Sequence, residues 1–100
     1  TELKDRRILA EEGFVSVYAV VETKTGTILA GPHIQARGMA EDDSVFDEVL
    51  PDVTNALAQA LKGGKADSHS LAQVMRRTLG RWVGRRLRRR PMIVPVVIEA

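Results

Sequence analysis

The side chains best suited to metal or acid–base chemistry are the two histidines, His33 and His69. A metal centre needs several His, Asp, Glu or Cys side chains at ligand spacing. Neither histidine stands in a motif such as His-x-His-x-Asp-His or His-Glu-x-x-His, and the chain contains no cysteine. A lone histidine is more often a surface or hydrogen-bonded residue than a ligand. We therefore predict no metal-binding and no cofactor-binding residue in this chain.

Hydroxyl and carboxylate groups form no catalytic pattern either. The serines lie in no nucleophile elbow, and nothing links them to a histidine and an acid. Asp42 and Asp43 are adjacent carboxylates before an apolar helical run, and such residues usually cap a helix. Gly63-Gly64-Lys65 lacks the spacing of a phosphate-binding loop and indicates a helix end. No catalytic residue is predicted, and the chain alone is not expected to be an enzyme.

Arginine is abundant enough to indicate binding. Eight arginines fall between residues 76 and 90, whereas six acidic residues fall between residues 41 and 52. A guanidinium group makes two charge-assisted hydrogen bonds to one phosphate. The alternatives are an acidic partner, an acidic surface of the same domain, and a helix face that is only solvated. The candidate RNA- or partner-binding residues are Arg77, Arg81, Arg85 and Arg88.

Aromatic residues that could stack on RNA bases are scarce. The chain has four aromatic residues: Phe14, Tyr18, Phe46 and Trp82. The spacing of Phe46 and Trp82 puts them on or beside predicted buried faces. Because single-strand recognition relies on exposed aromatic platforms, a base-reading surface is not expected.

Length and composition indicate one globular domain. The 100 residues are 44% hydrophobic and 28% charged, as is usual for a soluble chain with a single core. No apolar run approaches the roughly 20 residues of a membrane span, and no charged-then-apolar leader begins the chain. We expect a cytoplasmic protein without a membrane partner.

The first strand is predicted over residues 14–21. One pleat face carries Val15, Val17, Ala19 and Val21, and the other carries Phe14, Ser16, Tyr18 and Val20. Gly26 suits the positive-φ position of a short hairpin loop. Residues 27–34 are predicted to return as the second strand.

Prolines limit the other two strands. Because proline cannot donate a ladder hydrogen bond, Gly31-Pro32 predicts a bulge or an end in the second strand. Residues 92–98 are β-branched and form the predicted last strand. Pro95 marks this strand as an edge or bulged strand.

The first helix follows the acidic segment. Asp43 or Ser44 is expected to cap it, and Gly63-Gly64 ends it. Pro51 must either kink this helix or lie in the first turn of a helix that begins late. Its apolar arc comprises Val45, Val49, Val53, Ala56, Leu57, Ala60 and Leu61.

The second helix is predicted to begin at Asp67 or Ser68 and to fray after Gly84 toward Pro91. On its outer side, Arg77, Arg81 and Arg88 are expected to fall close together. Its inner face comprises Leu71, Val74, Met75, Leu79 and Trp82.

These elements predict an α+β fold. The order β-β-α-α-β favours two layers, with a three-stranded β-sheet and two α-helices on one face. Residues 1–13 are expected to be a linker or N-terminal arm, and residues 14–100 the folded domain. Because the sheet is small, another domain or subunit could cover its second face or its edges.

Three segments carry a resemblance to a known family. They are Asp5-Arg6-Arg7-x-Leu9-Ala10-x-x-Gly13, Gly31-Pro32-His33-Ile34-Gln35-Ala36-Arg37-Gly38 and Arg89-Arg90-Pro91-Met92-Ile93-Val94-Pro95-Val96. Together with the Lys-Thr-Gly turn, they make the chain similar to the C-terminal domain of ribonuclease J. Ribonuclease J is a bacterial RNase of the metallo-β-lactamase superfamily with a β-CASP insertion.

The resemblance implies a function for the parent protein. The catalytic body of the family binds zinc and cleaves RNA as a 5′-to-3′ exoribonuclease and an endoribonuclease in RNA processing and decay. None of its metal ligands lies in this chain. The C-terminal domain is associated with oligomerisation and full activity. The expected partners are therefore the catalytic body, further subunits in a homo-oligomer, and RNA through the parent.

Two hypotheses follow for this domain. The preferred one is a non-catalytic accessory domain that works through contacts of its sheet and N-terminal arm. The alternative is a direct RNA-binding module that uses the Arg-rich second helix. The remaining matched residues are expected to shape corners of the fold, with Gly38 free to adopt a positive φ. They are Gly31, Pro32, Arg37, Gly38, Arg90 and Pro91.

Overall fold

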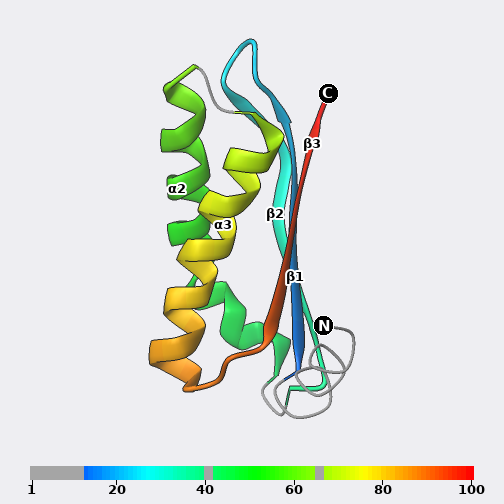
Figure 1. Cartoon of the computed structure of the whole chain (residues 1–100), viewed down its shortest axis with the longest axis vertical. Helices are drawn as coiled ribbons and strands as arrows, with labels where there is room; N and C mark the ends of the chain where they lie inside the picture. Colours follow the sequence, from blue (N-terminus) through cyan, green and yellow to red (C-terminus); the bar gives the residue numbers. More distant parts are fainter. Residues whose placement is uncertain (1–12, 40–41, 65–66) are drawn as a thin grey trace.

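The computed structural model describes residues 13–39, 42–64 and 67–100. Two helices, α2 and α3, cover one face of a three-stranded sheet (Figure 1). The elements are β1 (Phe14–Glu22), β2 (Thr27–Arg37), the 3₁₀ helix η1 (Asp43–Glu48), α2 (Leu50–Lys62), α3 (Ser68–Trp82), the π-helical turn η2 (Val83–Leu87) and β3 (Met92–Glu99). The predicted two-layer α+β fold is confirmed.

The sheet has the strand order β2-β1-β3, so that β1 is central. β1 and β2 form an antiparallel hairpin whose loop contains Gly26 at φ 68°. β3 pairs parallel with β1 on the side opposite β2, after a connection through the helices. β3 is therefore an edge strand, one of the two alternatives that Pro95 left open.

The core lies between the inner face of β1 and the two helices. Val15, Val17 and Val21 are fully buried, so the predicted alternation is correct. Each fully buried aliphatic side chain contributes about 1.5–3 kcal/mol to folding. The largest fully buried side chains of the helices are Leu57, Leu71, Met75 and Leu79.

The first helix begins in two stages. η1 precedes α2, and Pro51 lies in the first turn of α2, where its missing N–H is no loss. The alternative of a late-starting helix is therefore confirmed. The predicted cap at Asp43 or Ser44 is wrong, because Asp42 Oδ1 accepts the Ser44 N–H at 2.9 Å. The cap lies one residue earlier, since the 3₁₀ turn already includes Asp43.

The second helix begins and ends sharply. Asp67 caps α3, and the predicted inner face is buried except for the half-buried Val74. The predicted fraying at Gly84 is wrong, because the helix continues through η2 to Leu87. Arg88 then adopts a left-handed conformation with φ 55°, which ends the helical segment.

Asp67 should make folding stability depend on pH. The Ser70 N–H donates to the Asp67 carboxylate at 2.8 Å, and this bond lowers the Asp67 pKa below its ordinary value of 3.8. The stabilisation is therefore present above pH 3.8 and is lost as the pH falls through the lower folded pKa. We expect Asp67→Ala to lower the melting temperature at pH 7 and to weaken the acid dependence. Thermal melts across this range would contradict the role of the cap if both proteins gave parallel pH profiles.

The second strand runs further than predicted. β2 does not end at Ile34 but continues to Arg37, and the predicted irregularity appears as register shifts opposite β1 between Tyr18 and Val21. Gly31 has φ 81°, and a Cβ built there would lie 2.7 Å from the Tyr18 carbonyl oxygen. Only glycine tolerates both conditions. The following bond to Pro32 is cis.

Candidate interaction surfaces

The face of the sheet opposite the helices is a candidate docking surface. No described element packs on it, as the one-sided arrangement in Figure 1 shows. Tyr18 is 36% exposed, Val96 43% and Ile98 54%. We call the patch the open sheet face and define it by Phe14, Tyr18, Val20, Val94, Val96 and Ile98, which the strand register places on this side.

Polar groups lie at opposite ends of the open sheet face. Arg37 pairs with Phe14 at one end of the β1–β2 ladder, and Glu22 pairs with Thr27 at the other. Between them, the rings of Tyr18 and His33 lie in contact with centroids 5.1 Å apart. The face is therefore mainly apolar along β1 and β3 and polar along β2, where His33 and Gln35 are exposed. Arg37 makes one end cationic, and Glu22 makes the other anionic.

The free edge of β3 is poorly suited to pairing with another strand. Met92 and Ala100 donate their N–H groups to carbonyls of Gly13 and Val21. The N–H groups of alternate β3 residues, starting at Met92, therefore point toward β1. Pro95 belongs to the other set, so its backbone nitrogen points to the free edge. Its missing N–H leaves a gap in that edge. The sheet face, not this edge, is the better docking surface.

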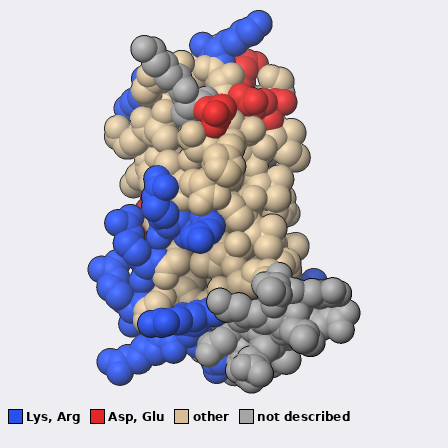
Figure 2. All heavy atoms as spheres, viewed as in Figure 1, with Lys and Arg blue, Asp and Glu red and all other residues tan. Residues whose placement is uncertain are grey.

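Arginines gather on the helical side, at the end of α3 that leads into β3. Figure 2 shows Lys and Arg side chains clustered there. Arg77, Arg81 and Arg85 are exposed and follow one another at four-residue spacing along α3 and η2. Arg88 lies beyond the helix, so the sequence placed it wrongly in the helical row.

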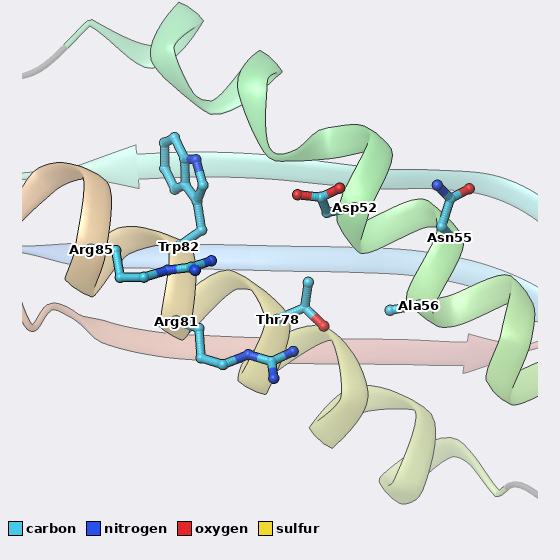
Figure 3. Close-up of a pocket in the computed structure, with 7 residues that line it drawn as sticks. All are labelled: Asp52, Asn55, Ala56, Thr78, Arg81, Trp82 and Arg85. Carbon is cyan, nitrogen blue, oxygen red and sulfur yellow. The ribbon is translucent and has the colours of Figure 1, made fainter.

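A hollow of about 310 Å³ lies between residues of α2 and residues of α3 and η2. Figure 3 shows the side chains of Arg81 and Arg85 extending in the same direction from α3 and η2. Asp52, Asn55 and Ala56 line it from α2, and Thr78 and Trp82 complete it. Sequence reasoning named the two arginines but missed the α2 residues, because only the tertiary fold brings them together.

Glu48 joins the acidic segment to the basic one. Its Oε2 accepts the Trp82 Nε1–H at 2.9 Å and lies 3.2 Å from Arg86 Nε. One arginine of the cluster, Arg86, is thus paired within the domain. The sequence had left open whether an acidic surface of the same domain contacts the arginines. The ion pair is half exposed and contributes little. No local pattern could have paired residues so far apart in sequence.

Of the six matched corner residues, two lie within β2, and four lie at a strand end or in a connection. Gly31 and Pro32 form the irregular part of β2, and Arg37 ends that strand. Gly38 has φ 71°, as predicted. Arg90 and Pro91 connect η2 to β3. The expected arm over residues 1–13 lies outside the described residues except for Gly13.

No metal centre is found in the described part of the chain, where no three His, Cys, Asp or Glu side chains gather closely enough to hold an ion. Both histidines are exposed and lie on different elements, β2 and α3. Among the described helices, none is long and apolar enough to span a membrane.

Comparison with known proteins identifies the family. A family model described as the ribonuclease J C-terminal domain matches residues 1–100. The chain is 42% identical over 93 residues to "Ribonuclease J" of Mycobacterium tuberculosis strain H37Rv, covering 93% of this chain and 17% of the relative. It is 40% identical to "Ribonuclease J" of Mycolicibacterium smegmatis over the same shares. It is 31% identical to "Ribonuclease J 2" of Staphylococcus aureus strain NCTC 8325, over 97% of this chain and 18% of that relative. The chain, which spans less than a fifth of these relatives, belongs to the ribonuclease J C-terminal domain family.

Proposed function

We propose that this domain is a non-catalytic part of a ribonuclease J that supports oligomerisation and full activity of the parent enzyme. It does so by docking its open sheet face onto the same face of a second copy. The observation that carries the proposal is the row of exposed apolar side chains, Tyr18, Val96 and Ile98, on a sheet otherwise buried by helices. Apolar patches of this kind mark protein contacts.

Charge placement favours a second copy as the occupant. In a two-fold dimer each contact occurs twice: if residue i of one copy touches residue j of the other, residue j of the first also touches residue i of the second. A two-fold axis that lies in the interface plane and crosses the strands would place opposite ends of the two faces together. Arg37 of one copy would then lie near Glu22 of the other at both ends of the interface. The apolar middles would pack as two aligned sheets.

The size of the face predicts a weak dimer. Three strands of about eight residues cover about 380 Å² at a strand spacing of about 4.8 Å and a rise of about 3.3 Å per residue. Specific interfaces bury roughly 500 Å² or more on each partner. We therefore expect a dissociation constant in the micromolar range or weaker for the isolated domain, with further contacts in the parent strengthening it.

In this proposal, RNA cleavage takes place in another part of the parent protein. The proposed partner in the same polypeptide is a catalytic body that uses zinc to cleave RNA from the 5′ end and internally, in the cytoplasm. The described residues do not fit a zinc centre, because they gather no set of three ligands. Residues 1–13 would link the two parts.

Sedimentation equilibrium of the 100-residue chain tests the assembly. We expect the average mass to rise with concentration from monomer toward dimer, and Val96→Glu to remain monomeric because it would bury a carboxylate in an apolar interface. Gln59→Glu on α2 adds the same charge away from the sheet and should still dimerise. The proposal fails if the wild-type chain stays monomeric or if Val96→Glu associates equally well.

A further inference from the structure

Four exposed arginines of the helical face make no ion pair with any described residue. They are Arg76, Arg77, Arg81 and Arg85. The neighbouring Arg86 differs, because it pairs with Glu48. Like charges four residues apart on a helix destabilise it by a few tenths of a kcal/mol per pair. The row Arg77, Arg81, Arg85 therefore works against the fold, and an external anion would relieve that repulsion.

The hollow between α2 and α3 has the composition of a sugar–phosphate site. Arg81 and Arg85 offer guanidinium groups, while Asp52 offers a carboxylate (Figure 3). Its volume of about 310 Å³ is at the lower end for small-ligand pockets. The Thr78 hydroxyl donates to the Val74 carbonyl at 2.9 Å, which leaves anion recognition to the arginines.

A second hollow extends the site. It measures about 350 Å³, is lined by Arg76, Arg77, Gly80 and Arg81, and shares Arg81 with the first. Two basic hollows on either side of one arginine suit an extended polyanion better than a single phosphate. Arg81 would lie at the centre of such a contact.

We propose that single-stranded RNA lies across these two hollows and is held by its backbone. Arg81 and Arg85 bind phosphate, and Asp52 accepts a hydrogen bond from a ribose 2′-hydroxyl, the group that distinguishes RNA from DNA. An acidic peptide offers no ribose hydroxyl that could donate to Asp52, so RNA better fits a hollow that combines arginines with a carboxylate. Binding is independent of base sequence, since Trp82 and Phe46 are buried and offer no stacking platform.

This contact is separate from assembly. The helices and the open sheet face lie on opposite sides of the sheet (Figure 1). A dimer formed through the sheet would leave both RNA sites exposed. Failure of RNA binding would therefore leave the proposed assembly intact, and a monomeric chain could still bind RNA.

Fluorescence anisotropy with a short oligouridylate and its deoxy counterpart tests the proposal. We expect the wild-type chain to bind RNA more tightly than DNA, with affinity falling steeply as salt rises. Arg81→Ala should weaken RNA binding by about tenfold and flatten the salt dependence. Lys24→Ala removes one positive charge from the exposed β1–β2 loop and should change the affinity by less than about twofold.

Asp52→Asn separates ribose recognition from charge. It removes a negative charge, so DNA binding should become tighter, and the ratio of RNA to DNA affinity should fall toward one. The proposal is overturned if RNA does not bind at low salt, or if Arg81→Ala has no greater effect than Lys24→Ala. It is also overturned if polyglutamate displaces RNA as well as unlabelled RNA does, or if Asp52→Asn leaves the RNA-to-DNA ratio unchanged.

Discussion

Trp82→Ala is expected to lower the free energy of unfolding by about 3–5 kcal/mol, the usual loss for a buried aromatic residue. Trp82 is 8% exposed, and its ring lies 5.5 Å from that of Phe46. It also donates to Glu48 at 2.9 Å, so its loss disconnects η1 from α3. Because small domains are stable by only about 5–15 kcal/mol, this variant should be close to unfolding at 37 °C. Urea denaturation followed by circular dichroism measures the change.

Trp82→Phe is the matched control. It keeps an aromatic ring but removes the indole donor, and Glu48 is half exposed, so that water can replace the lost bond. We expect a loss of about 1–2 kcal/mol. Equal effects of the two substitutions would contradict the packing role of the ring.

Gly31→Ala is expected to lower the free energy of unfolding by more than about 2 kcal/mol. The new Cβ would meet the Tyr18 carbonyl at 2.7 Å, and the residue would have to keep φ 81°. Both β1 and β2 would have to shift, because the clash is with backbone and not with a flexible side chain.

Gly64→Ala separates the two causes. Gly64 also has a positive φ of 74°, but a Cβ added there would meet no described atom within 4 Å. Its substitution should show only the cost of the left-handed conformation, about 1–2 kcal/mol. If thermal and urea melts give the same loss for both variants, the close approach at Gly31 is not what requires glycine there.

Local patterns were sufficient for the elements and the layers. Alternation from Val15 to Val21 fixed the inner face of β1, and the helical spacing of Leu71, Met75 and Leu79 fixed that of α3. Pro95 limited the last strand to an edge or a bulged strand, because the lack of an N–H has the same consequence in any sheet. These features depend on neighbours in sequence, which a single chain displays directly.

Three features were not predictable from apolar periodicity and local propensity. The extension of β2 to Arg37 results from pairing with β1 on both sides of Gly31. The π-helical turn after Trp82 extends the helix past Gly84, where local propensity favoured fraying. The position of the cap at Asp42 depended on a 3₁₀ turn that apolar periodicity does not reveal.

The candidate surfaces were only partly predictable, because each combines residues from elements that are far apart in the sequence. The arginine run was visible in the sequence, but its partner Glu48 and the opposing Asp52 come from another element. For the open sheet face, the sequence predicted only that another domain or subunit could cover the second face or the edges of a small sheet. Its charged ends follow from the register that pairs Phe14 with Arg37 and Glu22 with Thr27.

The docking of two open sheet faces is tested most directly by a dilution series of the isotope-labelled chain in nuclear magnetic resonance. We expect concentration-dependent chemical-shift changes at open-face positions such as Tyr18, Val20 and Val96, with little change at Arg77 or Arg81 of α3. Changes confined to the helical side, or spectra identical at every concentration, would contradict it.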